Sequence, residues 1–254
     1  AAAQTLLGQF EALERREGGR ISRSTNHKPH LLLTWLAELI RHPTVLDQVE
    51  CLIGPNILCW ASDFFSKSPG DGKRVTWHQD STYWGLSKPD VVTAWIAFTP
   101  STVESGCVRV IPGSHLMDQL PHGDTFAADN MLSRGQEISV EVDEDKAVDL
   151  VLQPGEMSLH HVRLIHGSEP NRAGHRRIGF AIRYLPTDVR QVSGIRDTAT
   201  LVRGHDAFGH FEHEPAPASD FDPDAVAFHA KSFADTTSIL YAGAAQRPPQ
   251  RMGR

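Results

Sequence analysis

Long hydrophobic runs are absent from this chain of 254 residues. No stretch approaches the roughly 18–20 consecutive apolar residues that a membrane-spanning helix needs, so we expect no membrane partner. A basic excess is absent too, because 25 Lys and Arg stand against 31 Asp and Glu and give a formal net charge of −6. Nucleic-acid-binding domains usually carry the opposite balance. We therefore expect no nucleic acid as a partner.

Cysteine is scarce. Cys51, Cys59 and Cys107 are odd in number and show no CxxC spacing, which favours reduced thiols in a cytoplasmic protein. The first 17 residues have no basic region ahead of an apolar core, so they predict no signal peptide. Their pattern is that of a helix that begins before residue 1, so we expect the natural chain to begin upstream. The 14 histidines draw attention to metal sites.

The order of the predicted elements indicates a mainly β fold with helices at its amino-terminal end. Residues 1–54 carry apolar side chains at helical spacing, and Gly54-Pro55-Asn56 ends that pattern. Short β-prone runs bounded by Gly, Pro, Asn and Asp follow, with no helix between them. The runs are residues 56–66, 74–80, 91–101, 106–114, 146–155, 156–168 and 176–186. Such a series predicts a sandwich or barrel.

We expect a single domain over residues 1–254, with helical support in 1–54 and a β core over about 56–190. Residues 112–138 are polar and irregular enough for a long insertion or lid. Residues 191–254 predict a wrapping segment of loops, with a short helix near 224–241. The oligomeric state cannot be read from the sequence.

A histidine and an aspartate stand two residues apart in the run "RVTWHQDSTYW". On a strand, side chains two residues apart point to one face. His78 and Asp80 therefore predict a surface ion pair, an acid–base pair, or two-thirds of a metal site.

A predicted hairpin near residue 170 supplies further polar residues. One strand ends near His166, a turn covers 170–174, and a second strand starts at about Arg176. One face of the second strand is apolar and suits packing under the helices: Ile178, Phe180, Ile182 and Tyr184. Its other face carries small residues with Arg177 and Arg183, which suits the floor beneath an anionic ligand.

Together these residues predict an iron site. His78, Asp80 and the distal His166 provide two imidazoles and one carboxylate, the set that leaves open positions on iron in non-haem Fe(II) oxygenases. Arg177 follows His166 by eleven residues. We expect it to bind the distal carboxylate of 2-oxoglutarate in a forked ion pair.

The chain resembles the phytanoyl-CoA dioxygenase family of Fe(II)- and 2-oxoglutarate-dependent oxygenases. The matching pieces cover most of residues 28–186 in the family's order: "VECLIGPNI", "WHQD", "AWIAFTPSTVESGCVRVIPGSH" and "HGSEPN". The resemblance implies a double-stranded β-helix, a cupin-like jelly roll buttressed by helices. It implies His78, Asp80 and His166 as iron ligands and Arg177 as the 2-oxoglutarate anchor. It also implies cosubstrate contacts by Ser168, Trp95 and Gln79.

The resemblance further implies a dioxygenase that uses O₂, releases succinate and CO₂, and is stimulated by ascorbate. Halogenating relatives replace the aspartate with a small residue, so Asp80 favours a hydroxylase or a desaturase. Nothing in the chain resembles a cradle for the phosphates of CoA. We therefore expect a small polar metabolite or a natural-product intermediate as substrate. A non-oxidative cupin-like isomerase or lyase and a non-catalytic binding protein are the alternatives.

Several polar residues outside the iron set have both a functional and a plain structural interpretation. Four are candidate substrate contacts: Trp84, His160, Arg183 and Lys28. A solvated Lys28, a packed Trp84 and an Arg183 paired with an acidic residue are the structural alternatives. His160 and His161 are rivals of His166 as the distal ligand, although an outer role around the metal suits them better.

Overall fold

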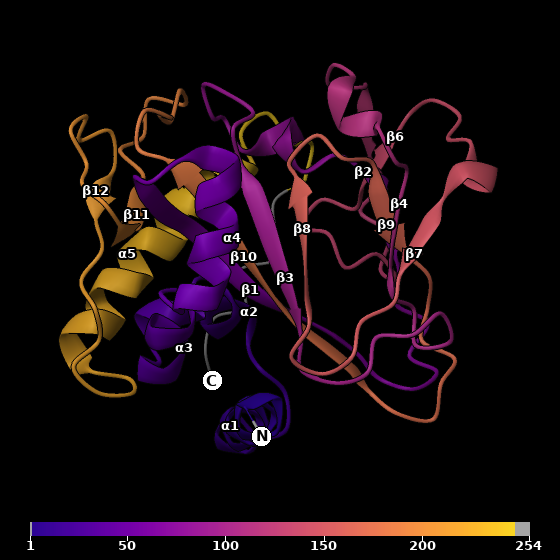
Figure 1. Cartoon of the computed structure of the whole chain (residues 1–254), viewed down its shortest axis with the longest axis horizontal. Coiled ribbons are helices and arrows are strands. Elements are labelled where there is room, and N and C mark those ends of the chain that lie inside the picture. Colours follow the sequence, from indigo (N-terminus) through magenta and orange to yellow (C-terminus); the bar gives the residue numbers. More distant parts are fainter. Residues whose placement is uncertain (1, 247–254) are drawn as a thin grey trace.

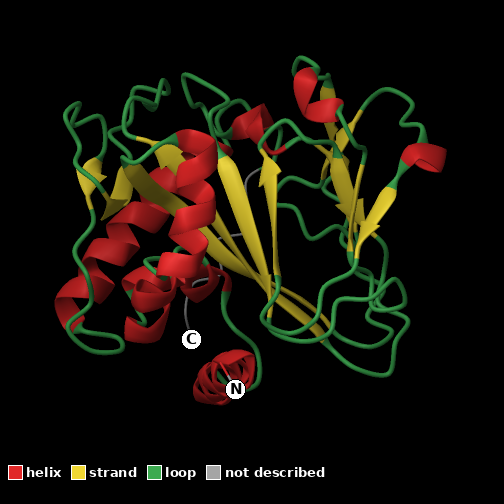
Figure 2. Ribbon diagram, in the orientation of Figure 1, coloured by secondary structure: helices red, strands yellow, loops and turns green. Residues whose placement is uncertain are grey.

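Two sheets face each other across an internal cavity, and helices cover the outer surface of the larger sheet (Figures 1 and 2). The computed structural model describes residues 2–246. The larger sheet has the order β12 (Glu212–His213), β11 (Thr198–Arg203), β1 (Ile57–Lys67), β10 (Arg177–Pro186), β3 (Val92–Ala97) and β8 (Met157–His161). The smaller has the order β2 (Val75–His78), β9 (His166–Ser168), β4 (Val108–Val110) and β7 (Val148–Leu150).

The remaining elements are a hairpin, helices and single turns. Strands β5 (His122–Asp124) and β6 (Gln136–Ile138) pair within the predicted insertion 112–138. The helices are α1 (Ala2–Arg16), α2 (Arg23–Asn26), α3 (Thr34–Leu39), α4 (Pro43–Ile53) and α5 (Pro223–Leu240). The 3₁₀ turns are η1 (Pro29–Leu31), η2 (Asp80–Tyr83), η3 (Ser114–Leu116) and η4 (Glu144–Lys146). None of the helices within residues 2–246 is long and apolar enough to cross a membrane.

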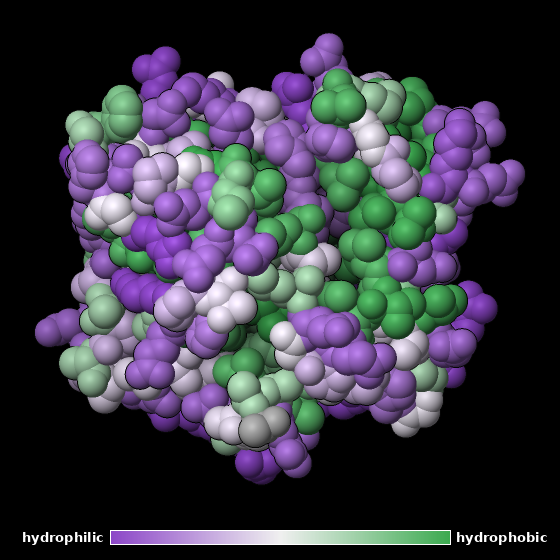
Figure 3. All heavy atoms as spheres, in the orientation of Figure 1, coloured by the Kyte–Doolittle hydropathy of each residue, from purple (hydrophilic) through white to green (hydrophobic). Residues whose placement is uncertain are grey.

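Among residues 2–246 no strand of the larger sheet pairs with a strand of the smaller one, so the two layers do not close into a barrel. Strands β8 and β7 are edge strands of the two sheets. Figure 3 shows hydrophobic residues gathered on the surface over the region between these two strands. The predicted mainly β architecture with amino-terminal helices is confirmed.

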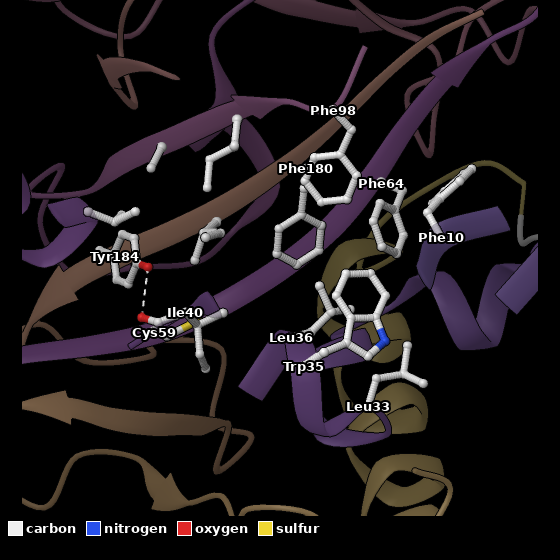
Figure 4. Packing of buried hydrophobic residues seen from close by; sticks show 14 of the residues in the cluster. Phe10, Leu33, Trp35, Leu36, Ile40, Cys59, Phe64, Phe98, Phe180 and Tyr184 are labelled. Atoms are coloured by element: carbon white, nitrogen blue, oxygen red, sulfur yellow. Dashed lines mark hydrogen bonds between the residues drawn. The ribbon is translucent and has the colours of Figure 1, made fainter. Parts of the chain in front are cut away.

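The alternation along β10 separates the core from the cavity. Its bulky residues Ile178, Phe180, Ile182 and Tyr184 are buried against the helices, as the sequence predicts. Figure 4 shows Phe180 and Phe64 of the sheet packed near Trp35 of α3. Tyr184 donates a hydrogen bond of 2.8 Å to the carbonyl of Ile40, so its buried hydroxyl is satisfied.

Residues 156–168 do not form one strand, and the expected hairpin around residue 170 is wrong. Strand β8 belongs to the larger sheet, while β9 pairs with β2 and β4 in the smaller one. Strands β9 and β10 therefore lie in opposite sheets. Local β-propensity indicates that a segment is extended but not which partner it pairs with. The sequence therefore could not show that the chain passes from one sheet to the other between β8, β9 and β10.

The carboxy-terminal segment contributes more than loops. Strand β11 pairs with β1 and extends the larger sheet, which the sequence did not predict. The helix expected near 224–241 is confirmed as α5.

Lys28, one of the expected substrate contacts, ties this segment to the amino-terminal region. It is fully buried, and its ammonium group donates to Glu214 Oε1 at 2.7 Å and to the carbonyl and hydroxyl of Thr198 at 2.7 and 3.0 Å. The same carboxylate accepts from Thr200 and contacts His30. Because an ammonium group has three donors, Lys28 has none left for a ligand.

We predict that Glu214→Gln destabilises the fold by about 3–5 kcal/mol, because it leaves the charge of Lys28 buried without a counter-charge. Chemical denaturation followed by circular dichroism would measure the change. The exposed pair of Lys88 and Asp188 supplies a matched control. Asp188→Asn should leave the unfolding midpoint nearly unchanged, and an equal effect of the two substitutions would contradict the prediction.

Candidate metal and cosubstrate site

Two imidazoles and one carboxylate meet on the cavity side of the smaller sheet. His78 ends β2 and His166 begins β9, and these two residues are direct partners in the pairing of the two strands. Their ring centroids lie 4.1 Å apart. One ligand atom from each of His78, Asp80 and His166 lies within 4.8 Å of the other two.

Asp80 is not on the strand, contrary to the expectation from the sequence. Strand β2 ends at His78, and Asp80 is the first residue of the turn η2. The chain turns there in a way that still brings Asp80 Oδ1 to 3.3 Å from His78 Nε2. The pair therefore shares one side because of the turn and not because of strand periodicity.

Backbone carbonyls orient both imidazoles. Nδ1 of His78 lies 2.8 Å from the carbonyl of Thr76, and Nδ1 of His166 lies 2.9 Å from that of Leu164. A carbonyl only accepts hydrogen bonds, so each Nδ1 carries the proton and each Nε2 keeps a free lone pair. Histidines that bind metals are commonly held in this way.

The protonation states suit a metal. Burial, with a smaller contribution from His78, lowers the pKa of His166 to about 3, so its imidazole is neutral at pH 7. Burial opposes ionisation of Asp80, but the neighbouring His78 and the other nearby imidazoles hold its pKa below the ordinary value. A neutral imidazole and an ionised carboxylate are donors that Fe(II) binds. The residues present therefore fit the metal.

Arg177 lies in the same cavity, at the start of β10. It is 1% exposed, its Nε has no hydrogen-bond partner, and it forms no ion pair within residues 2–246. Burial lowers its pKa to about 10, which still leaves it charged at pH 7. A buried charge without a partner is costly, so this arrangement points to an anion that the cavity takes up.

Ser168 and Trp95 line the cavity with Arg177, as the sequence predicts for contacts of one ligand. The Arg177 guanidinium lies 5.2 Å from the centroid of the Trp95 ring. Gly179 makes room for that ring, because a Cβ at this position would clash with Trp95.

Gln79, the third expected cosubstrate contact, has its side chain engaged by the protein. Its amide nitrogen donates to the carbonyl of Arg163 at 2.8 Å, and its amide oxygen accepts from the backbone of Leu120 at 2.8 Å. It does not line the cavity. Gln79 lies between His78 and Asp80, and its side chain holds the loops behind the metal site.

Two of the four expected substrate contacts line the cavity, and Trp84 and Lys28 do not. His160 and Arg183 are in its wall, on β8 and β10. Trp84 lies outside it and packs against Trp60, with ring centroids 5.0 Å apart. Arg183 pairs with Asp63, as the structural alternative suggested, and its guanidinium carbon lies 5.8 Å from the Trp84 ring centroid.

Two further polar residues beside the candidate ligands were missed by the sequence analysis. Thr93 lines the cavity between Arg183 and His160, and Lys67 contacts Ser168. Thr93 had a local signal, since it is a polar residue within an apolar strand. Lys67 had none, because a lysine at the end of a strand is usually solvated.

The sequence matches the family model for phytanoyl-CoA dioxygenase over residues 11–179. The chain belongs to this family. It is 31% identical to human peroxisomal phytanoyl-CoA dioxygenase over 165 residues, which cover 61% of this chain and 48% of that protein. The chain spans about half the length of the curated relatives that it matches.

Solved structures agree with the family. The non-heme monooxygenase ThoJ superposes with a TM-score of 0.84 at 33% identity, covering 94% of this chain and 90% of that one. CytC3 with Fe(II) and alpha-ketoglutarate superposes with a TM-score of 0.60 at 29% identity, covering 87% and 85% of the two chains. The predicted jelly roll is confirmed, and the predicted enzyme class agrees with the family to which the chain belongs. The cofactors of CytC3 agree with those that the sequence predicts.

We predict that His166, and neither His160 nor His161, is the distal ligand, and that His160→Ala, like His161→Ala, retains Fe(II). His161 is the last residue of β8, and its ring does not line the cavity but lies 6.0 Å from the ring of His115. Its Nδ1 accepts a hydrogen bond from the backbone of Arg163. His166→Ala should therefore lose Fe(II) binding at micromolar metal, and His161→Ala should retain it. Anaerobic Fe(II) titration would measure both. Loss of metal by His161→Ala alone would refute the assignment.

Proposed function

We propose that this chain uses Fe(II) and 2-oxoglutarate to hydroxylate a small polar metabolite or natural-product intermediate, with release of succinate and CO₂. His78, Asp80 and His166 would hold the metal, and Arg177 would hold the distal carboxylate of 2-oxoglutarate. The observation that carries the proposal is Arg177, a buried cation that has no ion-pair partner among residues 2–246 and lies in the cavity that the three candidate ligands also line. A guanidinium matches a carboxylate in a forked, charge-assisted pair.

The chain's own residues position and protect the reactants. The carbonyls of Thr76 and Leu164 fix the two imidazoles, so that both Nε2 atoms are available on one side. Trp95, Val108 and Ala181 give the cavity an apolar lining that limits water. The metal and cosubstrate, when bound, would supply the activation of O₂, and the protein supplies geometry and placement.

Among the reactions known in the family, the ligand set of this chain favours hydroxylation. Asp80 occupies the carboxylate position, which halogenating relatives replace with a small residue. Its Oδ1 lies 3.3 Å from Nε2 of His78, and its lowered pKa keeps it ionised.

A row of polar side chains supports a polar substrate. Arg183, Thr93 and His160 are direct cross-strand partners on β10, β3 and β8. Each is buried and has an atom without a hydrogen-bond partner among the described residues: Arg183 Nε, Thr93 Oγ1 and His160 Nδ1. The ion pair of Arg183 with Asp63 balances its charge. The row therefore offers hydrogen bonds without net charge, which suits an uncharged polar group of the substrate.

A non-oxidative cupin-like enzyme would need the metal ligands but not Arg177. The two functions differ in whether 2-oxoglutarate is consumed. The test of the proposal is succinate release from 2-oxoglutarate in the presence of Fe(II) and O₂, screened against pools of neutral polar metabolites. Turnover of a substrate without 2-oxoglutarate would favour the cupin-like alternative.

We predict that Arg177→Ala raises the dissociation constant for 2-oxoglutarate by about a hundredfold or more. Two charge-assisted hydrogen bonds, each worth about 1.5–3 kcal/mol, are lost, and roughly 1.4 kcal/mol is a factor of ten. Arg177→Lys should restore only part of the affinity, because it provides a point charge without the fork. Anaerobic calorimetry on the Fe(II)-loaded protein would measure the constants.

Arg176 supplies the matched control. It is the preceding residue, and its guanidinium forms two 2.7 Å bonds to Glu14 of α1 outside the cavity. Arg176→Ala should bind 2-oxoglutarate like the unaltered protein. If neither arginine affects the affinity, the assignment of the anion site is incorrect.

We predict that Thr93→Val lowers kcat/KM for the substrate found in the screen by roughly tenfold, since one hydrogen bond contributes about 0.5–1.5 kcal/mol. The affinity for 2-oxoglutarate should not change. Thermal stability should not fall either, because the hydroxyl has no partner among residues 2–246. Unchanged kcat/KM would argue against substrate contact by this row.

A further inference from the structure

Lys67 is a second buried cation beside Arg177. It is the last residue of β1 and the direct cross-strand partner of Arg177. Its exposed fraction is 0%. Lysine is rarely buried to this extent unless it is paired, yet Lys67 forms no ion pair with a carboxylate of residues 2–246. The mechanism proposed above leaves it without a role.

The ammonium group of Lys67 holds the end of β9. It donates to the hydroxyl of Ser168 at 2.6 Å, to the carbonyl of Ser168 at 3.1 Å, and to the carbonyl of Glu169 at 2.5 Å. All three of its donors are therefore used. Ser168 in turn lines the cavity together with Arg177.

This contact determines which way the Ser168 hydroxyl can donate. An ammonium group has donors only, so Ser168 Oγ must accept from Lys67. The hydroxyl proton is then free to donate elsewhere, and no other protein acceptor for it is found among the described residues. A carboxylate oxygen bound by Arg177 would be a suitable acceptor, because such an oxygen only accepts.

The local charge also favours an anion. Burial, reinforced by the positive charge of Arg177, lowers the pKa of Lys67 to about 7. A carboxylate bound beside Lys67 and Arg177 would raise the pKa of Lys67 again, because an opposite charge stabilises the charged form of the lysine.

We propose that Lys67 is a positioning residue of the cosubstrate site, which presents the Ser168 hydroxyl as a donor to the distal carboxylate of 2-oxoglutarate and adds a second positive charge there. The inference rests on the function proposed above. It assigns Lys67 no contact with the metal and none with the oxo-acid end of the cosubstrate.

A purely structural role makes a different prediction. If Lys67 only held the backbone at residues 168 and 169, its loss would disturb β9 as a whole, including His166 at the start of that strand. Binding at the metal end would then weaken as much as binding at the carboxylate end. Pyruvate distinguishes the two roles, because it has the oxo-acid end of 2-oxoglutarate but lacks the distal carboxylate.

The test compares the full chain with Lys67→Met, whose unbranched side chain is one atom shorter and lacks the charge and the donors. Dissociation constants for 2-oxoglutarate and for pyruvate would be measured by anaerobic calorimetry on Fe(II)-loaded protein. We expect Lys67→Met to raise the dissociation constant for 2-oxoglutarate at least tenfold and the constant for pyruvate less than twofold. Lys67→Gln keeps a donor without the charge, so its affinity for 2-oxoglutarate should lie between those of the unaltered protein and Lys67→Met. The same comparison can be made with Lys67→Gln alone if Lys67→Met does not fold.

Ser168→Ala and the double variant complete the experiment. If Lys67 acts through Ser168, the loss in the double variant should be smaller than the product of the two single losses. The proposed positioning role of Lys67 would be overturned if its variants bound pyruvate and 2-oxoglutarate equally more weakly, or if they bound 2-oxoglutarate as tightly as the unaltered protein. Failure of the unaltered protein to bind 2-oxoglutarate would instead overturn the proposed function, and this inference with it.

Discussion

The pairing of β1 with β10 at the centre of the larger sheet is the constraint on which the site depends. Bulky residues of β10, from Ile178 to Tyr184, are buried under the helices, so the opposite face must point into the cavity. A slip of one residue would exchange the two faces. Arg177 and Arg183 would then enter the apolar core, and the row of Thr93 and His160 would lose its neighbour.

Hydrogen-bond satisfaction separates structural charges from functional ones in this protein. Lys28 and Arg177 are both about 1% exposed. Every donor of Lys28 is used by Thr198 and Glu214, and it therefore fastens two distant segments. Arg177 has no ion-pair partner within the described residues and leaves its Nε unsatisfied. A buried polar group without a partner normally requires an explanation, and a bound carboxylate provides one.

The candidate metal position depends on the second sheet. His78 and His166 lie 88 residues apart in the sequence and become neighbours because β2 pairs with β9. The carbonyls that orient their rings belong to the same two chain segments. Each segment therefore provides both an imidazole and the group that fixes its tautomer, and the pairing of two short strands assembles the site.

The sequence by itself determined the family, most of the helical and extended segments, the facing of β10, and the residues His78, Asp80, His166 and Arg177 as candidates. These follow from local periodicity and from motifs within short windows. Only the tertiary structure decided the rest. Gln79 and Lys28 are polar residues in promising places, yet nearby backbone groups and a glutamate 186 residues away satisfy them. Lys67 and Thr93 acquire their positions from cross-strand pairing, and strand pairing depends on long-range contacts that no local pattern records.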